Sequence, residues 1–298
     1  MLPWPTHMRS RVHTLIASLF VATVACVDAM GQQSYPPYTL VTRYTQYDAN
    51  GETLRVMTHT RYQSSSGDWR SVVKVGGGEQ ATLYRRGKGV YQSDSRTSRL
   101  IKFMDHAPGC PIRTGEELRR DPKFVRTEEV LGFRSYVLSE NAAKDLLIEY
   151  YFVPELGGGT PLKQVTLYKN GPKSVSEPVS VTLGEPAASD VTGPDYLVVE
   201  QEPVFLKNLD KHLLSKPDAA YPTEALVHGW SGVVQVMVTV DETGAVISAS
   251  ALDAGLPPQS LRDAAIDAAY KALFKSVIAE GRIVVAKGIL AYRFVLPK

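Results

Sequence analysis

From residue 38 to residue 183 the sequence alternates apolar and polar residues at a period of two, and turn-forming residues recur about every ten positions. Successive side chains of a β-strand point to opposite faces, so this alternation is typical of strands with one buried face. After a first strand that begins at Tyr38, we expect strands over residues 53–62, 69–75, 80–85, 89–92, 99–103, 127–138, 146–153, 162–168 and 179–183. The pattern predicts a large, mainly antiparallel sheet with little helix, at best a short one over residues 115–120.

A second region of strict alternation lies near the C-terminus. Four valines share one face of a strand expected over residues 233–240: Val234, Val236, Val238 and Val240. Residues 241–244 form a four-residue hairpin loop, with Gly244 where a positive φ is commonly needed. A return strand is expected over residues 245–252. The resulting hairpin has one strongly apolar side, which needs a cover.

The cover is expected from the helix that follows. Pro257 and Pro258 break the chain, and Ser260 with Asp263 three residues later resembles a capping box. Small apolar residues then recur at helical spacing on one face: Leu261, Ala264, Ala265, Ala268 and Ala272. A last strand is expected up to residue 296, starting at residue 283, with Gly288 as a bend or bulge.

These patterns divide the chain into an antiparallel β-rich domain over residues 36–185, a linker over residues 186–215 and a small module over residues 216–298. The module has the order short helix, strand, strand, helix, strand. The predicted fold class is therefore α+β, with a mainly antiparallel β domain followed by an αββαβ-type module.

The N-terminus has the pattern of a secretory signal peptide. Arg9 and Arg11 precede an uncharged run over residues 15–27, which is shorter than the about 20 apolar residues that span a bilayer. We expect residues 1–31 to be removed and the mature chain to be periplasmic. A lipoprotein acylated at Cys26 is the alternative, but the residues before it lack the large aliphatic residue usual three positions upstream.

The composition argues against several classes of function. The formal net charge is +2, from 33 basic and 31 acidic residues, so nothing indicates a nucleic-acid partner. Removal of the signal leaves Cys110 as the only thiol, and His106 four residues away lies in the same Pro- and Gly-rich loop, outside any helix. The histidines lack metal-ligand spacing, and no nucleophile or phosphate-binding motif occurs. We expect no enzyme activity, no cofactor and no metal.

The C-terminal module carries several motifs in a definite order. Tyr221-Pro222 opens it, Gly229-Trp230-Ser231-Gly232 precedes Val-Val-Gln-Val, and Val-Asp-Glu-Thr-Gly-Ala-Val follows up to Val246. A helix then ends near Phe274, and the last strand closes on Ala-Tyr-Arg-Phe at 291–294. This stretch resembles TonB C-terminal domains over residues 216–298. Ser276 stands where the family often has a proline, and the chain has no proline-rich rod and no retained membrane anchor.

The resemblance implies a protein-binding function. TonB C-terminal domains add a short extended peptide of an outer-membrane transporter to an exposed sheet edge, through main-chain hydrogen bonds. The candidate partner-binding residues lie on the last strand: Ile289, Ala291, Tyr292, Arg293 and Phe294. Half of these side chains must point into the core, and Phe294 is expected to pack there. The residues shared with the family motif are expected to be structural: Tyr221, Pro222, Gly229, Gly232, Gly244 and Phe274. An uncovered edge would also allow a homodimer.

The first domain carries a second resemblance. Leu-Gly-Phe-Arg-Ser-Tyr at 131–136, Glu-Tyr-Tyr-Phe-Val-Pro at 149–154 and Gly-Glu-Pro at 184–186 resemble LolA-like sheet proteins. That family implies a curved half-barrel that holds acyl chains on an apolar face, so a lipid or lipoprotein carrier is the alternative function. A spacer domain with a closed core explains the same residues.

Overall fold

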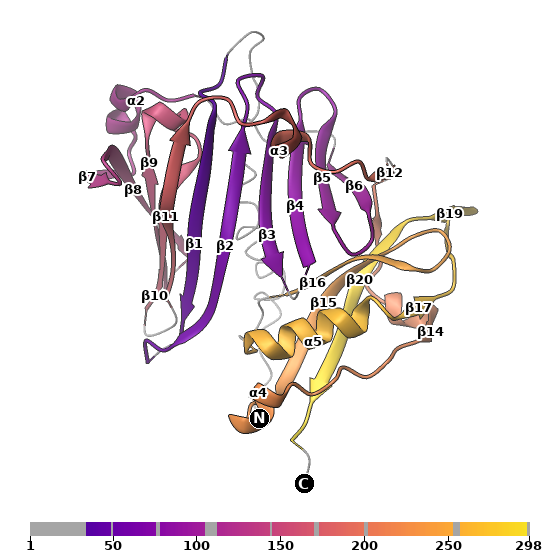
Figure 1. Cartoon of the computed structure of the whole chain (residues 1–298). Helices are drawn as coiled ribbons and strands as arrows, with labels where there is room; N and C mark the ends of the chain where they lie inside the picture. The colour runs from indigo at the N-terminus through magenta and orange to yellow at the C-terminus, as the bar shows by residue number, and fades with distance from the viewer. Residues whose placement is uncertain are drawn as a thin grey trace.

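The structure, a computed structural model, describes residues 34–48, 50–75, 78–104, 112–143, 145–169, 173–199, 202–252 and 257–296. The expected signal peptide with Cys26, and the loop with His106 and Cys110, lie outside these residues. Figure 1 shows a broad curved sheet, with a smaller module packed below the ends of β3 (Trp69–Val75) and β4 (Gly78–Arg85).

The broad sheet is built almost entirely from antiparallel neighbours. Its other strands are β1 (Tyr38–Tyr47), β2 (Thr53–Gln63), β5 (Gly89–Asp94), β6 (Arg99–Met104), β7 (Phe124–Val130), β8 (Phe133–Ala143), β9 (Leu146–Phe152), β10 (Pro161–Tyr168), β11 (Lys173–Leu183) and β12 (Leu197–Val199). The spatial order is β12-β6-β5-β4-β3-β2-β1-β11-β10-β9-β8-β7, and β12 runs parallel to β6. The predicted mainly antiparallel, β-rich character is confirmed.

One predicted strand of this sheet is two strands. Residues 127–138 were expected to be continuous, but β7 ends at Val130 and β8 begins at Phe133. Leu131 and Gly132 between them have φ values of 50° and 77°. A two-residue hairpin turn of type I′ needs a positive φ at both positions, which leucine rarely adopts, so Leu131 gives no sequence signal of the turn. The short helix α2 (Gly115–Arg120) forms as expected, with a capping box from Thr114.

One face of the large sheet points toward the module. Strand register places these residues on that face: Tyr38, Leu40, His59, Arg61, Trp69, Val73, Gln80 and Asp94. The Arg61 guanidinium lies 4.1 Å from the centroid of the Trp69 ring. At the lower end Val73 belongs to the core of the module, and Met57 packs against it. The core of the module therefore extends onto the lower end of the large sheet.

The module is a four-stranded sheet with one helix on its face. Its strands β13 (Val204–Phe205), β15 (Gly232–Val240), β16 (Val246–Ala251) and β20 (Ala286–Phe294) lie in the order β13-β20-β15-β16. Helix α5 (Gln259–Ala269) covers the sheet, as Figure 1 shows. The four alternating valines of β15 are 0% exposed, and Ala265, Ala268 and Ala269 of α5 are buried with them. The expected hairpin and its covering helix are both present.

Three local expectations in the module were wrong. The helix expected to end near Phe274 ends at Ala269, and Phe274 lies in a short strand after it. Ser260 does not cap α5, because the helix begins after Pro258 without a side-chain cap, and Asp263 accepts a hydrogen bond of 2.7 Å from Gln259 instead. The expected strand from residue 283 to 296 is divided into β19 (Arg282–Val284) and β20. The remaining elements are α4 (Thr223–Val227), β17 (Leu273–Phe274) and β18 (Val277–Ala279), which pairs with β19.

Residues between the two sheets are structured. They form α3 (Ala188–Thr192), β12, β13, the 3-10 turn η2 (Leu209–His212) and β14 (Leu213–Ser215). β12 extends the large sheet beside β6, whereas β13 pairs with β20 and β14 with β17 in the module. The segment that the sequence predicted as a linker thus contributes strands to both parts.

Candidate partner-binding edge of the C-terminal sheet

The edges of the module's sheet decide whether it can accept another strand. An edge strand presents unpaired N–H and C=O groups, which another extended chain can use as a template. The strand order places β16 at one side of this sheet and the short β13, beside β20, at the other. Each side has its own set of contacts.

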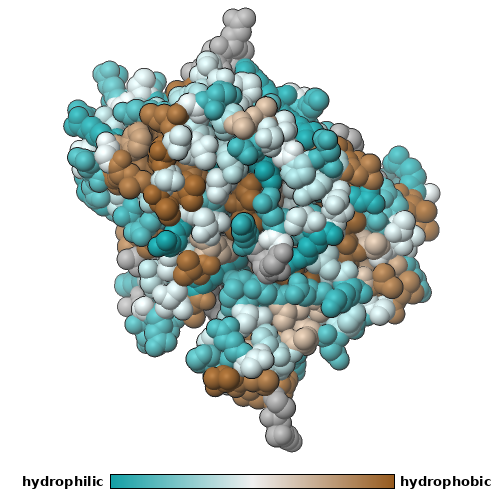
Figure 2. Space-filling view, viewed as in Figure 1, coloured by the Kyte–Doolittle hydropathy of each residue, from teal (hydrophilic) through white to brown (hydrophobic). Residues whose placement is uncertain are grey.

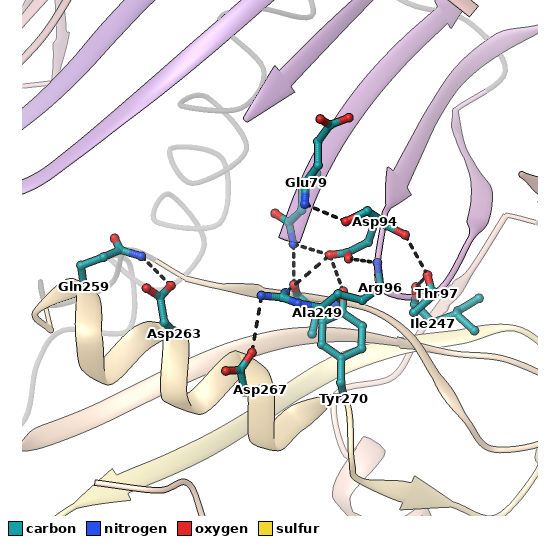
Figure 3. A network of polar contacts seen from close by, with 12 residues as sticks. Glu79, Asp94, Arg96, Thr97, Ile247, Ala249, Gln259, Asp263, Asp267 and Tyr270 are labelled. Carbon is teal, nitrogen blue, oxygen red and sulfur yellow. Dashed lines mark hydrogen bonds and ion pairs between the residues drawn. The ribbon is translucent and has the colours of Figure 1, made fainter. Parts of the chain in front are cut away.

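The β16 side is closed by residues from the large sheet and from α5. Gln80 Nε2 donates to the Ala249 carbonyl at 2.8 Å, and Thr97 Oγ1 donates to the Ile247 carbonyl at 2.8 Å. The Ala249 N–H donates to the Tyr270 hydroxyl at 3.0 Å. Figure 3 shows these groups meeting at the end of the large sheet. Because the Ile247 carbonyl and both main-chain groups of Ala249 already have partners, a strand added at this edge would have to break contacts between the two sheets.

Asp94 is the centre of this contact. Its carboxylate, 2% exposed, accepts hydrogen bonds from the Tyr270 hydroxyl at 2.5 Å, from Gln80 Nε2 at 2.9 Å and from the Arg96 backbone N–H at 2.9 Å. Arg96 also reaches Asp267 of α5 at 3.4 Å. Burial, and then the neighbouring Asp94 carboxylate, raise the pKa of Tyr270, so its hydroxyl stays a donor.

On the other side, β13 covers the first part of β20. The Val204 N–H donates to the Val285 carbonyl at 2.9 Å, and the Leu206 N–H donates to the Lys287 carbonyl at 2.8 Å. Leu209, 1% exposed, then packs on Gly288, where a Cβ would lie 2.5 Å from the Leu209 Cβ. Gly288 was expected to mark a bend or bulge. The structure gives another reason for this glycine, because η2 approaches the strand too closely for a side chain. The chain's own residues therefore occupy the edge up to Gly288.

Beyond Gly288, the outward groups of β20 belong to every second residue. The carbonyls of Val285 and Lys287 point to β13, and alternation places the N–H and C=O groups of Ile289, Ala291 and Arg293 on the same side. β15 pairs with one side of this stretch, and among the described residues no strand pairs with its outward side. This outward side is the candidate place for an added strand.

One side chain touches this stretch. The Lys216 ammonium donates to the Ala291 carbonyl at 2.8 Å and lies 4.8 Å from the centroid of the Tyr292 ring. Lys216 is exposed and follows directly after β14. The Ala291 carbonyl thus accepts from an exposed side chain rather than from main chain.

The five candidate residues of β20 divide between its two faces. Ala291 and Arg293 are exposed and Ile289 is partly buried, whereas Tyr292 and Phe294 are 2% and 3% exposed. Burial raises the pKa of Tyr292 to about 12. Tyr292 and Phe294 offer neither side chains nor outward main-chain groups to a partner. As expected for Phe294, both pack in the core of the module.

The residues of the family motif shape the module. The Tyr221 hydroxyl donates to the Trp230 carbonyl, and its ring meets Phe294 edge to face at 5.7 Å between centroids. Pro222 is the N-cap of α4, and Gly229 and Gly232 have φ values of 64° and 151°. At Gly244 φ is 91°, and a Cβ there would overlap the Phe274 carbonyl. The Phe274 N–H in turn donates to the Gly244 carbonyl at 2.9 Å.

Exposed apolar side chains lie near the end of the β20 edge. Figure 2 shows hydrophobic residues at the tip of the module that carries α4. Leu226 and Val227 of α4 are exposed, as are Val233, which is opposite Arg293, and Val295 directly after β20. The free stretch therefore ends beside an apolar surface.

A small polar cavity lies where β2 meets α5. Arg55, His59 and Arg262 line it together with Met57 and Gln80. Burial, and then the Arg55 charge, lower the pKa of His59 to about 4 and that of Arg262 to about 9. The described residues contain no group of three or more potential metal ligands and no helix long and apolar enough to cross a membrane.

Sequence reasoning missed the residues that close β16 and touch β20. Asp94 and Thr97 lie in a stretch that reads as a turn, and Gln80 opened a predicted strand. Lys216 only marked the start of the predicted module. No local signal identifies such partners, because they come from elements distant in sequence.

Comparison with known proteins agrees with the sequence motifs. Residues 217–296, just over a quarter of the chain, match the family model of the Gram-negative bacterial TonB protein C-terminal. This match confirms the resemblance of the module to TonB C-terminal domains. No curated protein matches the chain.

Several solved structures match the chain at low identity and with low TM-scores. The MucA/MucB complex of Pseudomonas aeruginosa gives 14% identity over 79% of this chain and 82% of that chain, with a TM-score of 0.32. A LolA superfamily protein from Nitrosomonas europaea gives 11% identity over 60% of this chain and 96% of that chain, with a TM-score of 0.29. PNGF-II gives 11% identity and a TM-score of 0.28, and the chain spans 45% of its length. Likenesses at these scores assign no function.

Proposed function

We propose that this protein is a periplasmic protein-binding adaptor. In this proposal an extended segment of an outer-membrane transporter, or of another envelope protein, pairs with Ile289, Ala291 and Arg293 at the free edge of β20. Main-chain hydrogen bonds supply the affinity, which is the usual basis of strand addition. The match of residues 217–296 to the TonB C-terminal family supports this class of partner.

One observation carries the proposal. The β16 edge is sealed by Gln80, Thr97 and Tyr270, while the β20 edge after Gly288 keeps its outward main-chain groups without a paired strand among the described residues. The rest of the chain that the structure describes thus hydrogen-bonds to the β16 edge of this sheet and leaves the end of the β20 edge without a paired strand. Of the two long strands at the sides of this sheet, β20 is therefore the one that a partner strand can reach.

Substitution of Ala291 by proline tests the proposal. The Ala291 N–H points outward, so proline removes a group that β15 does not use, and an edge strand tolerates proline at such a position. We expect Ala291→Pro to keep the fold, measured by circular dichroism, and to weaken capture of β-barrel transporters from a solubilised outer-membrane fraction by about tenfold or more. Ala291→Val, which keeps the N–H, is the matched control.

Mass spectrometry identifies the captured proteins. Capture of β-barrel transporters by wild type and by Ala291→Val, but not by Ala291→Pro, supports the adaptor. Equal capture by all three would show that the partner does not use this edge.

The second candidate is an acyl-chain carrier. It is favoured by aromatic side chains on the face of the large sheet that points toward the module. Register places Tyr84, Tyr136 and Phe152 on that face, in line with Tyr38 and Trp69. Trp69 stacks on Tyr84, and both are buried. A spacer domain with a closed core and no ligand would bury the same side chains.

Native mass spectrometry of the full-length chain separates the carrier from the closed core. A carrier purified from the periplasm retains fatty-acyl mass that solvent extraction releases. A spectrum that contains only the protein mass, before and after extraction, would favour the closed core.

A further inference from the structure

Residues 204–216 make two kinds of contact with the β20 edge, one fixed by packing and one made by an exposed side chain. Leu209 is buried against Gly288, and two main-chain hydrogen bonds hold Val204 and Leu206 beside the start of β20. This end of the segment is anchored by packing, so it stays in place when a partner binds. Lys216, by contrast, is exposed and reaches the edge only through its ammonium group.

Any strand that pairs with β20 must remove the Lys216 ammonium. The Ala291 carbonyl is one of the outward acceptors that an added strand needs, and the Lys216 Nζ already uses it at 2.8 Å. Exposed lysine contacts are weak, and the four-carbon stem allows the ammonium to swing away. The displaced charge remains tethered at the edge, within side-chain reach of the newly added strand.

The two long strands beside this edge carry basic but no acidic side chains. Arg293 of β20 is exposed and Lys287 is partly buried, and neither β15 nor β20 contains an acidic residue. Beside a neutral segment the displaced ammonium would be hydrated, whereas a segment with a carboxylate would add an ion pair with it. Charge complementarity therefore favours an acidic extended segment.

We propose that Lys216 is a displaceable plug of the β20 edge, and that it gives this edge a preference for extended segments that carry a carboxylate. This inference rests on the proposed strand addition at β20 and specifies the chemistry of its partner. The anchored β13 and η2 limit the added strand to the stretch after Gly288, so the segment is short and its acidic side chain lies close to Ala291.

Designed peptides test the preference with the full-length chain. The probes are fluorescein-labelled hexapeptides of alternating threonine and valine, in which one Glu replaces each position in turn, and a matching set with Gln. Fluorescence anisotropy gives the dissociation constants for wild type, Lys216→Met, Lys216→Arg and Lys211→Met. Lys211 is an exposed lysine of the same segment and serves as the matched control.

We expect wild type to bind the Glu peptide about two- to fivefold more tightly than the Gln peptide at one or two positions, with the ratio falling at high salt. Lys216→Met is expected to lose this ratio and to bind the Gln peptides more tightly than wild type does, because the plug is gone. Lys216→Arg and Lys211→Met are expected to keep the ratio.

The outcomes separate this inference from the proposed function. Equal binding of Glu and Gln peptides by wild type, or a ratio that persists in Lys216→Met, overturns the role of Lys216 while strand addition stands. If no peptide binds at millimolar concentration, or if Ala291→Pro binds them as wild type does, both the plug and the proposed edge are overturned.

Discussion

Replacement of Asp94 by alanine removes the centre of the contact that closes β16. In the native protein this carboxylate accepts from the Tyr270 hydroxyl, the Gln80 amide and the Arg96 backbone N–H at 2.5 to 2.9 Å. Alanine leaves all three donors without this acceptor in a site where Asp94 is 2% exposed. The substitution should therefore loosen the junction between the large sheet and the module, not merely one side chain.

The size of the effect follows from the donors left behind. A buried donor that loses its partner costs about 1–3 kcal/mol. Gln80 keeps the Ala249 carbonyl as a second acceptor, so Tyr270 and Arg96 dominate. We expect Asp94→Ala to lower the free energy of unfolding by about 3–5 kcal/mol. Asp94→Asn retains one acceptor oxygen and should cost less, about 1–3 kcal/mol.

Urea unfolding followed by Trp fluorescence measures the loss, and hydrogen exchange locates it. The Ala249 amide, which donates to Tyr270, should exchange faster in Asp94→Ala. Asp218→Ala, at an exposed position, is the control and should change stability by less than about 0.5 kcal/mol. A loss below about 1 kcal/mol in Asp94→Ala, with unchanged exchange at Ala249, would refute the role of this contact.

Two further predictions concern single positions. Gly244→Ala should destabilise the module by about 2 kcal/mol or more, because φ is 91° and the new Cβ would overlap the Phe274 carbonyl; a urea midpoint equal to that of wild type would contradict this. The pKa of His59 is lowered to about 4 in the folded protein, so below pH 6.5 the unfolded chain binds a proton that the folded chain does not. His59 therefore lowers the free energy of unfolding by up to about 3 kcal/mol as pH falls from about 6.5 to about 4. Because the side chain is only partly buried, solvent screening makes the loss smaller than this limit. His59→Gln should lack that loss, and an identical pH profile of stability for the two proteins would contradict it.

The parts of the fold that local periodicity determines could be predicted. The valines of β15 alternate with polar or exposed residues, and the small residues of α5 recur at helical spacing, so the hairpin, the helix and their buried faces follow from the sequence. The turn at Leu131 was missed because its conformation is rare for leucine. Ser260 suggested a cap that the helix, which begins after Pro258, does not use.

The state of the two sheet edges could not be predicted. Gln80 and Ala249 are 169 residues apart, and Asp94 and Tyr270 are 176 residues apart, so no local pattern connects them. β13 has only two residues, too few for any periodic signal. The last strand was expected to lie at an edge of the sheet. β13 and Leu209 cover its first part, which depends on tertiary packing, so only the part of β20 after Gly288 stays free.

Residue-resolved hydrogen exchange at β20 tests the account most directly. The N–H groups of Ile289, Ala291 and Arg293 point outward, whereas those of Leu290 and Tyr292 face β15. With a saturating strand peptide or a captured transporter segment, we expect NMR-detected exchange to slow at 289, 291 and 293 and to stay unchanged along β16. Slower exchange along β16 instead, or none at the three outward amides, would contradict strand addition at β20.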